Sequence, residues 1–276
     1  MASFAFKQLD VFSSEPLKGN PLAVVLGADG LSDDQMAAFA RWTNLSETTF
    51  LLKPTTDEAD YRVRIFTTQR ELPFAGHPTI GTCHAWLEAG GQPRGDVIVQ
   101  ECGVGLVKLR RDGTRLAFAA PPLIRSGEPD AGIVERIVAG LRIAREDVVG
   151  TQWVDNGPGW IAVMLKDRDT VLSLKPDYNE LGGLKLGVVA PWTGGDAQFE
   201  VRAFIAGEGM AEDPVTGSLN ASLAQWLIGS GRAPAQYVAS QGTALGRKGR
   251  VFIEQVGDDI WVGGASVTCI DGRVTI

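Results

Sequence analysis

The chain has 276 residues, of which 44% are hydrophobic and 21% charged, and its formal net charge is −7. This length suits two domains of ordinary size, and the apolar fraction is enough to build their cores. The acidic balance argues against nucleic acid or an anionic membrane as a partner, because both require a basic footprint. No run of about eighteen apolar residues indicates a membrane span.

The N-terminal residues and the cysteines bear on the compartment. Residues 1–10 lack a basic stretch followed by an apolar core, so we expect no secretion signal. Cys83, Cys102 and Cys269 are widely spaced and odd in number, which fits reduced thiols better than a disulfide framework. We therefore expect a cytoplasmic protein.

Short β-branched and aromatic runs alternate with glycine turns along the chain, so much of it is predicted to be strand. A capping-box-like start at Ser32 predicts a helix whose apolar side is formed by Met36, Phe39, Ala40 and Trp42. Another helix is predicted over 131–141.

One phrase occurs twice, about half a chain apart. Residues 71–77 read Glu-Leu-Pro-Phe-Ala-Gly-His, and residues 212–218 read Glu-Asp-Pro-Val-Thr-Gly-Ser. Val-Arg-x-Phe stands ahead of each copy, at 63–66 and at 201–204. A single repeat of this length indicates two similar domains rather than a solenoid. The two matching loops would then be able to face each other across a cleft.

The repeat extends beyond this phrase. The turn Gly-Asn-Pro at 19–21 has a counterpart in Asn-Gly-Pro at 156–158, and a short apolar run follows each turn. The stretch over 100–109, a glycine turn leading into a strand, resembles the stretch over 240–253.

A largely apolar helix is predicted after each copy of the phrase, over 78–87 and over 219–228. Such a helix is typical of the inside of a domain rather than its surface. Pro78 suits a first helical position, and Ser218 or Thr216 suits the cap of the second helix. Each domain is therefore predicted to be a curved sheet wrapped around one central helix.

The start of a helix presents unpaired N–H groups and a partial positive charge, which together bind anions such as carboxylates. Gly76 and Gly217 permit close backbone approach at these starts. If the two loops face one another, an acidic substrate would be held between two helix starts and screened from water.

Polar residues near the loops are candidates for chemistry. His77 follows Gly76, and its position alone is as compatible with a helix cap as with a functional role. His84 falls inside the apolar helix and is expected to be a hydrogen-bonded core residue. Asp213 occupies the place of Leu72 in the other copy, and this break in the repeat favours a function.

Three glutamates have simpler local interpretations. Glu71 and Glu212 match each other, and matched residues in a duplicated fold are more often structural. Glu47 has no basic neighbour in sequence, so its local context favours a surface turn acid.

No Cys-x-x-Cys or His-x-x-x-His spacing, dinucleotide fingerprint, Walker sequence or Gly-x-Ser-x-Gly elbow is present, so we expect no metal site and no such cofactor.

Three motifs and the opening of the chain resemble the PhzF-like phenazine-biosynthesis family. The motifs are Asn-Leu-Ser-Glu-Thr at 44–48, Glu-Leu-Pro-Phe-Ala-Gly-His-Pro at 71–78 and Glu-Asp-Pro-Val-Thr-Gly-Ser at 212–218. The opening is Phe-Ser-Ser-Glu-Pro-Leu-Lys-Gly-Asn-Pro at 12–21. The resemblance covers essentially the whole chain. It implies the α+β fold of diaminopimelate epimerase, with two pseudo-symmetric domains, each a barrel-like sheet around a central helix, and an active site between them.

The resemblance also implies domain boundaries and an assembly. The N-terminal domain would cover 1–118, and the final strand, 266–276, would return to it. The C-terminal domain would cover 119–265. The family further suggests a homodimer that acts on a small carboxylate-bearing substrate.

The resemblance assigns roles to site residues. Glu47 would be the general acid and base that shuttles a proton, which overturns its local interpretation. His77 and Asp213 would bind and orient polar groups of the substrate. The substrate carboxylate would be held by Gly76, Gly217 and Ser218. The implied activity is a cofactor-free isomerisation similar to that of trans-2,3-dihydro-3-hydroxyanthranilate.

Alternatives remain at this stage. Diaminopimelate epimerases place a cysteine before each loop glycine, but the matching residues here are Ala75 and Thr216, which disfavours a two-thiol racemisation. An epimerase or dehydratase of an amino-acid-like substrate remains the alternative among enzymes. A non-catalytic ligand-binding protein on the same fold is the third possibility. Asn220 departs from the family pattern and would reshape the pocket.

Overall fold

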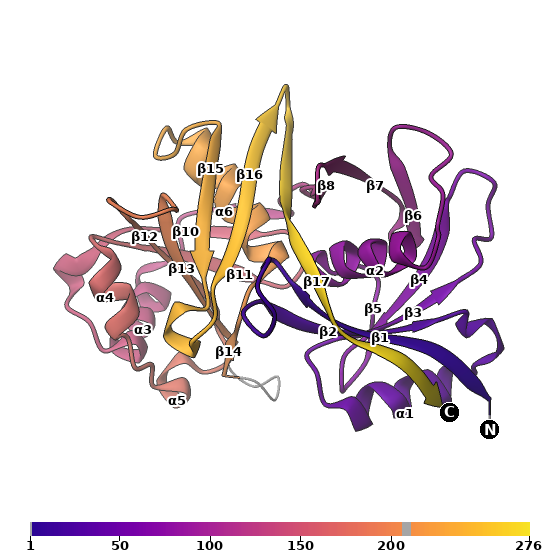
Figure 1. The fold of residues 1–276 in the computed structure, drawn as a ribbon. Helices are drawn as coiled ribbons and strands as arrows, with labels where there is room; N and C mark the ends of the chain where they lie inside the picture. The colour runs from indigo at the N-terminus through magenta and orange to yellow at the C-terminus, as the bar shows by residue number, and fades with distance from the viewer. Residues whose placement is uncertain (1, 206–210) are drawn as a thin grey trace. The chain divides into compact units, whose positions relative to one another are not determined.

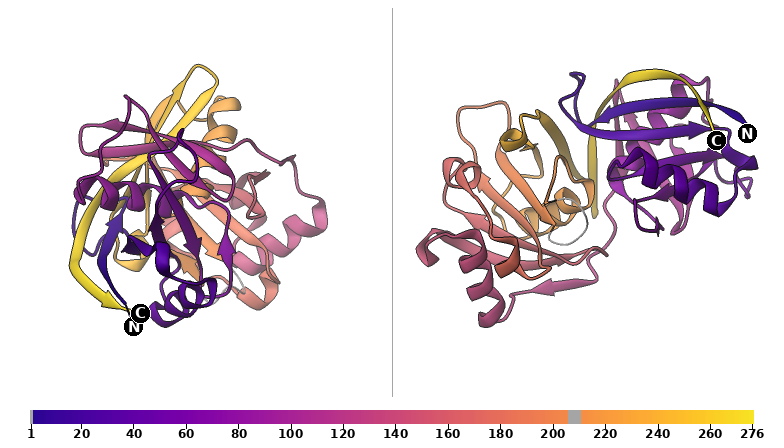
Figure 2. Two further views of the ribbon diagram at one scale, coloured as in Figure 1. Left: turned by 90° about the vertical axis from the view of Figure 1, so that its right-hand side faces the viewer. Right: turned by 90° about the horizontal axis from the view of Figure 1, so that it is seen from below.

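The computed structural model describes residues 2–205 and 211–276, and its internal contacts divide the chain into two units. Unit 1 comprises Met1–Ala119 and Gly263–Ile276, and unit 2 comprises Ala120–Val262. Both units mix strands and helices (Figures 1 and 2), as expected for the α+β class.

The strands of unit 1 are β1 (Ser3–Val11), β2 (Asn20–Leu26), β3 (Thr48–Leu52), β4 (Tyr61–Phe66), β5 (Glu71–Leu72), β6 (Ile98–Cys102), β7 (Gly105–Asp112), β8 (Arg115–Ala119) and most of β17 (Asp259–Thr275). Its helices are α1 (Asp33–Thr43) and α2 (Gly76–Glu88).

The sheet of unit 1 closes around α2 (Figure 1). Its strands follow the order β8–β7–β6–β4–β3–β2–β1–β17, and β17 also pairs with β8. Helix α2 contacts β1, β2, β3 and β8. Ile80 and Cys83 on this helix are fully buried, and a buried isoleucine side chain contributes roughly 1.5–3 kcal/mol to stability. The predicted central helix is therefore present in this unit.

Helix α1 packs on a second cluster of unit 1 that includes Phe50 and Phe66. The predicted capping box forms, because Ser32 and Gln35 each accept a hydrogen bond from the other's backbone N–H. Met36, Phe39 and Ala40 are buried as predicted. The prediction for Trp42 is wrong, since this side chain is 79% exposed. It lies at the edge of the apolar side, where its ring stacks on Phe39 at 6.0 Å.

The strands of unit 2 are β9 (Arg125–Gly127), β10 (Val148–Asp155), β11 (Trp160–Leu165), β12 (Lys185–Pro191), β13 (Phe199–Ile205), β14 (Glu212–Asp213), β15 (Gln236–Gln241) and β16 (Gly249–Val256). Its helices are α3 (Ala131–Leu141), α4 (Arg168–Ser173), α5 (Tyr178–Leu181) and α6 (Gly217–Gly229). Helix α3 has the predicted bounds. Helix α6 contacts β10, β11 and β16, while α3, α4 and α5 supply side chains to a separate cluster.

The two units share one pairing pattern, which confirms the predicted pseudo-symmetry. In unit 1 the parallel pairs are β2–β3 and β4–β6, and in unit 2 they are β11–β12 and β13–β15. A two-residue strand precedes the central helix in both units, β5 beside β4 and β14 beside β13. Both central helices begin two residues earlier than predicted, at Gly76 and Gly217. Pro78 is thus the third helical residue, where an N–H would also lack a helical partner.

The matched glutamates of the repeated phrase are structural, as predicted. Glu71 accepts a bidentate pair of hydrogen bonds from Arg64, with Nε to Oε1 at 2.7 Å and Nη2 to Oε2 at 2.6 Å. Glu212 accepts the same pair from Arg202, at 2.9 and 2.7 Å. Each arginine comes from a Val-Arg-x-Phe segment, so this Arg–Glu fork ties the two-residue strand to its neighbour.

The chain ends meet in unit 1. β1 and β17 form a long antiparallel ladder, from Ser3 opposite Thr275 to Val11 opposite Ser266. Ala2 and Ile276 exchange backbone hydrogen bonds of 2.8 and 3.0 Å. Figures 1 and 2 show the N and C labels side by side in every view.

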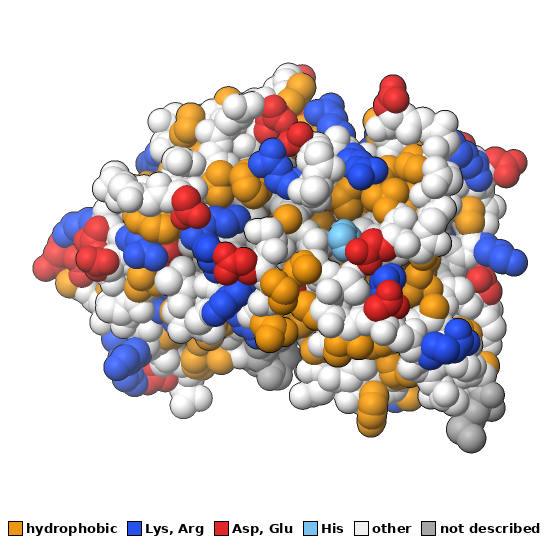
Figure 3. Space-filling model, viewed as in Figure 1, with side chains coloured by type: hydrophobic (Ala, Val, Ile, Leu, Met, Phe, Trp, Pro, Cys, Tyr) orange, Lys and Arg blue, Asp and Glu red, His pale blue; other side chains and the backbone are white. Residues whose placement is uncertain are grey.

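The surface drawn in Figure 3 carries both signs of charge, with Lys and Arg side chains interspersed among Asp and Glu. Among residues 2–205 and 211–276, no helix is long and apolar enough to cross a bilayer.

The two Arg–Glu forks differ in burial, which predicts different contributions to stability. The side chains of Arg202 and Glu212 are 7% and 8% exposed, whereas those of Arg64 and Glu71 are 22% and 42% exposed. Glu212→Gln should lower the free energy of unfolding by about 3 kcal/mol, because it leaves a buried guanidinium without its counter-charge. Glu71→Gln should cost about 1 kcal/mol or less. Urea unfolding of the two variants measures both values, and equal losses would contradict the prediction.

Candidate functional site

The repeated loops are anchored in the same way in both units. After β6, Gly103 packs on Pro73, and a Cβ atom at Gly103 would lie 2.7 Å from the Pro73 Cα. After β15, Gly242 packs on Pro214, and its Cβ would lie 2.7 Å from the Pro214 carbonyl oxygen. Any side chain at these glycines would push the loop away. The proline of each repeated phrase therefore fixes where the central helix begins.

Glu47 and His77 lie close together in unit 1. Glu47 directly precedes β3, and His77 is the second residue of α2. Because β3 runs parallel to β2, with Thr48 opposite Ala23, the sheet carries Glu47 to the start of the central helix. Glu47 Oε2 lies 3.5 Å from His77 Nε2. The Glu47 side chain is only 17% exposed, so its local interpretation as a surface turn acid is wrong.

Asn20 joins this pair and is not among the predicted site residues. It is fully buried at the start of β2, and its Nδ2 lies 3.4 Å from His77 Nδ1. Ser46, next to Glu47, donates its hydroxyl to Asn20 Oδ1 at 3.5 Å. The sequence signal for Asn20 is its place in the repeated turn at 19–21, which points to its loop but not to its partner.

His77 is held in its neutral form. Burial lowers the pKa of its imidazole to about 3, and a hydrogen bond with the Pro21 backbone opposes this only in part. A neutral ring carries one donor and one acceptor nitrogen. The imidazole beside Glu47 is therefore a polar partner for that carboxyl group and not a permanent counter-charge.

In unit 2, Asp213 belongs to a network that closes the second loop. It is buried, and its Oδ2 accepts the Thr216 hydroxyl at 2.5 Å. Gln241 donates to the Asp213 carbonyl at 3.1 Å and to Thr216 Oγ1 at 2.9 Å. Gln241 Oε1 accepts the Thr216 N–H at 3.0 Å. Thr216, one of the two predicted capping residues, is the N-cap residue of α6, but its hydroxyl bonds Asp213 and makes no hydrogen bond to the first N–H groups of the helix.

Asn220 fastens the same loop. It is buried, and its Nδ2 donates to the Thr216 carbonyl at 2.9 Å and to Gln241 Oε1 at 2.8 Å. These two bonds tie the loop to the first turn of α6 and to Gln241. That Asn220 reshapes the pocket stays a prediction. Gln241 was not identified from the sequence, because its partners lie far from it along the chain.

Gly76 and Gly217 are the first residues of α2 and α6, and neither helix start carries a side-chain cap. The first N–H groups of a helix have no partner within it, so both starts can donate to an anion. Ser218 follows Gly217 in the first turn of α6, and its hydroxyl accepts from Trp160 Nε1 at 3.1 Å.

The structure thus assembles two groups of predicted residues. Glu47, Gly76 and His77 come together in unit 1, and the second group, in unit 2, consists of Asp213, Gly217 and Ser218. The prediction that the two loops face one another concerns the placement of the units and stays a prediction.

The remaining candidates lie apart from both groups. His84 is half-buried, and its Nε2 lies 3.1 Å from Glu88 Oε1 and 3.4 Å from Thr268 Oγ1, so it is hydrogen-bonded as expected. Burial raises the pKa of the Cys83 thiol to about 12. Within the described part of the chain, no three His, Cys, Asp or Glu side chains are grouped to hold a metal ion.

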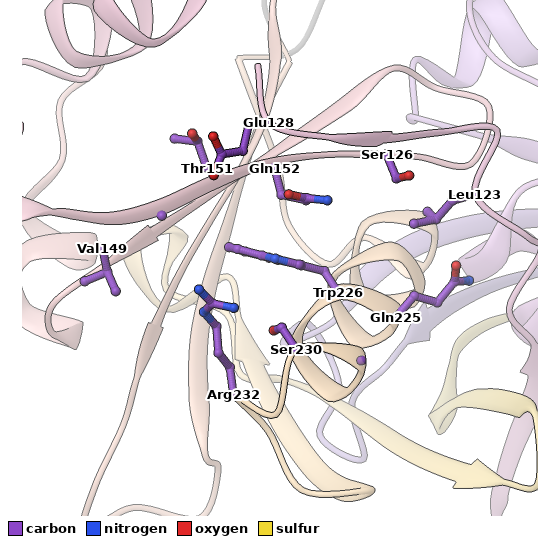
Figure 4. Close-up of a pocket in the computed structure, with 12 residues that line it drawn as sticks. Leu123, Ser126, Glu128, Val149, Thr151, Gln152, Gln225, Trp226, Ser230 and Arg232 are labelled. Carbon is purple, nitrogen blue, oxygen red and sulfur yellow. The ribbon is translucent and has the colours of Figure 1, made fainter. Parts of the chain in front are cut away.

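A surface groove of about 560 Å³ lies within unit 2, between β9, β10 and the C-terminal half of α6. Figure 4 shows the Trp226 ring between Gln152 and Arg232 in this groove. None of the predicted site residues lines it. The helix starts, and not this groove, therefore carry the arrangement expected for chemistry.

Comparison with known proteins identifies a family and several relatives of this chain. Residues 9–272 match the family described as phenazine biosynthesis-like protein, PhzC-PhzF. The chain is 38% identical over 296 residues to antisense-enhancing sequence 1 of Schizosaccharomyces pombe, with 99% of each chain covered. It is 34% identical over 255 residues to the trans-2,3-dihydro-3-hydroxyanthranilate isomerase of Pseudomonas aeruginosa, covering 90% of this chain and 89% of the relative. The relatives therefore include isomerases.

Solved structures show the same fold. A phenazine biosynthesis protein of the PhzF family from Bacillus anthracis matches over 100% of both chains, with a TM-score of 0.87 at 22% identity. A hydroxyproline epimerase from Agrobacterium vitis matches over 99% of this chain and 92% of its own, with a TM-score of 0.58 at 12% identity. The predicted epimerase-like fold is confirmed.

The neutral state of His77 predicts a pH dependence of stability. Its pKa is about 3 in the folded protein and near 6.5 in the unfolded chain. Between these values the unfolded state binds more protons, so stability falls as the pH falls from about 6.5 toward 3. His77→Gln should remove up to about 1.4 kcal/mol per pH unit of this dependence. Urea unfolding at several pH values between 4 and 7 measures the slope.

His84→Gln is the matched control for this prediction. Burial also lowers the pKa of His84, but this ring is more exposed and faces Glu88, so the slope should change less. The chain has two histidines, and NMR titration can follow both rings. Protonation of His77 near pH 6 would contradict the prediction.

Proposed function

We propose that this chain, which belongs to the phenazine biosynthesis-like (PhzC-PhzF) family, is an isomerase that moves a proton within a small carboxylate-bearing metabolite. The substrate would be similar to trans-2,3-dihydro-3-hydroxyanthranilate, the compound named for the Pseudomonas aeruginosa relative. The observation that carries the proposal is the largely buried Glu47 carboxyl group, 3.5 Å from a neutral His77.

Glu47 would act as both base and acid. Its carboxylate takes a proton from one carbon, the electron pair of that C–H bond becomes part of a new double bond, and the existing double bond shifts. The protonated Glu47 then gives the proton to the carbon at the far end of the shifted system. One C–H bond breaks and one forms, so the formula is unchanged and no electron acceptor takes part.

The neutral imidazole suits this cycle. A protonated histidine beside a carboxylate favours the charged carboxylate and would hinder its protonation. The neutral His77 ring leaves Glu47 able to hold a proton between the two steps. A carboxyl group screened from water is also better matched to the weak acidity of a carbon acid.

The other residues would bind the substrate. His77 would orient polar groups beside Glu47, and Asp213 would do so from the second loop. The carboxylate would be held by backbone N–H groups at Gly76 and Gly217 and by the Ser218 hydroxyl, since helix starts favour negative charge.

The two-thiol epimerase mechanism has less support. The residues before the loop glycines are Ala75 and Thr216, and the Thr216 hydroxyl is already bonded to Asp213 and Gln241. Cys83 lies inside α2, fully buried and with a raised pKa. A thiol in this state is a poor base.

Glu47→Gln should lower the rate of proton transfer about 10²–10⁴-fold, which is the usual contribution of a general acid and base. The protein is incubated in D₂O with trans-2,3-dihydro-3-hydroxyanthranilate and with related carboxylic acids, and NMR follows deuterium at carbon. Cys83→Ala is the control and should retain the rate.

Unchanged turnover in Glu47→Gln would contradict the proposed proton shuttle. Absence of exchange with every acid in the panel would favour a ligand-binding protein on the same fold.

A further inference from the structure

The turn between β10 and β11 is held by one carboxylate. Asp155 Oδ1 accepts hydrogen bonds from the N–H groups of Gly157 at 2.7 Å and Gly159 at 2.6 Å. These glycines have φ angles of 131° and 90°, a region that residues with side chains rarely adopt. The repeated turn at 156–158 therefore has a defined shape, with Asn156 on one side and Trp160 just beyond it.

Two side chains of this turn converge on Ser218. Asn156 Nδ2 donates to the Ser218 carbonyl at 3.0 Å, and Trp160 Nε1 donates to the Ser218 hydroxyl oxygen at 3.1 Å. Ser222 Oγ also donates to the Ser218 carbonyl, at 2.7 Å. The backbone and the side chain of Ser218 are thus both fixed from β11 and its turn.

The contact with Trp160 sets the direction of the serine hydroxyl. A hydroxyl group has one donor hydrogen and two acceptor lone pairs, whereas an indole N–H can only donate. Trp160 occupies one lone pair of Ser218 Oγ and leaves its hydrogen for another acceptor. Among residues 2–205 and 211–276, no hydrogen bond takes up that hydrogen.

The position of Ser218 in its helix explains why the hydrogen is left over. A serine inside a helix commonly donates to the carbonyl four residues earlier, as Ser222 does to Ser218. Ser218 lies in the first turn of α6, where the preceding residues are not helical. The Ser218 hydroxyl therefore lies in the first turn of α6, beside backbone N–H groups that also have no partner within the helix.

In the described residues of the other unit, the matching positions make no such contact. Counted through the matched strand ladders, Leu22 of β2 stands where Trp160 stands on β11. Leu22 is fully buried against Gly81 and has no N–H to donate. In that unit the residue after the loop glycine is His77, whose neighbour is Asn20. Trp160 therefore occurs in the unit whose loop glycine is followed by a serine, and not in the unit whose loop glycine is followed by a histidine.

We propose that Trp160, supported by Asn156, is a positioning residue that makes Ser218 a one-directional donor to the carboxylate of the substrate. This inference rests on the proposed function, because the carboxylate is the group that the first turn of α6 would hold. Ser218 Oγ–H and the free N–H groups of that turn would donate to the carboxylate together. Trp160 itself is 2% exposed and bonds the serine, so it would act through Ser218 and not on the substrate directly.

The test compares two ligands that differ in one group. 3-Hydroxyanthranilate is the aromatic counterpart of the proposed substrate, and 2-aminophenol is the same molecule without its carboxylate. Trp160→Phe keeps a ring but removes the indole N–H. It should weaken binding of 3-hydroxyanthranilate about 3–10-fold, as expected for a lost hydrogen bond that supports a charged group. Binding of 2-aminophenol, measured by calorimetry on the full chain, should not change.

A double variant separates positioning from packing. Ser218→Ala should weaken 3-hydroxyanthranilate binding about tenfold, and adding Trp160→Phe to it should cause no further loss. If Trp160→Phe folds poorly, Asn156→Ala tests the other support of Ser218, the hydrogen bond to its carbonyl, and should likewise weaken only 3-hydroxyanthranilate binding. Trp153→Phe, on the neighbouring strand β10 and beside Arg125, is the matched control and should bind both ligands normally.

Three outcomes would overturn the inference. Equal losses for both ligands in Trp160→Phe would assign Trp160 to packing alone, as would a full additional loss in the Ser218→Ala background. Binding of neither ligand by the unaltered protein would also contradict it. The proton shuttle is judged separately, by deuterium incorporation in the Glu47→Gln variant, so the two proposals can fail independently.

Discussion

The chain enters each enclosed central helix through a loop, and the buried polar backbone groups and charged side chains of that loop must find partners. This constraint applies to both units. The repeated phrase meets it with two contacts. A bidentate Arg–Glu fork ties the two-residue strand to its neighbour, as between Arg202 and Glu212. The loop proline packs on the glycine that directly follows the next strand, as Pro214 does on Gly242. With these contacts in place, the first turn of the helix lies at a defined point of the unit. His77 and Ser218 lie in these first turns, and the strand β3 brings Glu47 beside His77.

The duplicated fold separates scaffold from chemistry. Positions that are identical in both copies play the same part twice. The arginine and the glutamate form the bidentate fork, the proline packs on a glycine, and the loop glycine begins the central helix. Positions that differ make different contacts. His77 is a buried neutral ring beside Glu47, whereas Ser218 is a hydroxyl aligned by Trp160. Ala75 has no polar side chain, whereas the hydroxyl of Thr216 bonds Asp213. A duplication that preserves the helix start leaves the residues around it free to diverge.

The fold was largely predictable because its signals are local or repeated. The internal repeat, the apolar runs after the two loops and the capping box at Ser32 each depend on residues close together in sequence. The candidate site was less predictable from the residues, because its contacts are distant along the chain. Glu47 meets His77 only because β3 pairs in parallel with β2, and nothing in the local sequence around Glu47 shows this pairing. Asn20, Gln241 and Trp160 were missed for the same reason: each is an ordinary residue until the sheet brings its partner to it.

The meeting of the chain ends in unit 1 has a consequence for biosynthesis. Unit 2 is continuous, from Ala120 to Val262, and each of its strand pairings is available once those residues have been made. Unit 1 needs β17, most of which is synthesised after unit 2, to pair with both β1 and β8. Contacts across almost the whole chain form slowly, because a long loop must close first. Unit 2 follows most of unit 1 in sequence, yet it is the first of the two units that can fold on the ribosome. The half of the molecule that carries Glu47 becomes complete only after the whole of unit 2 has been made.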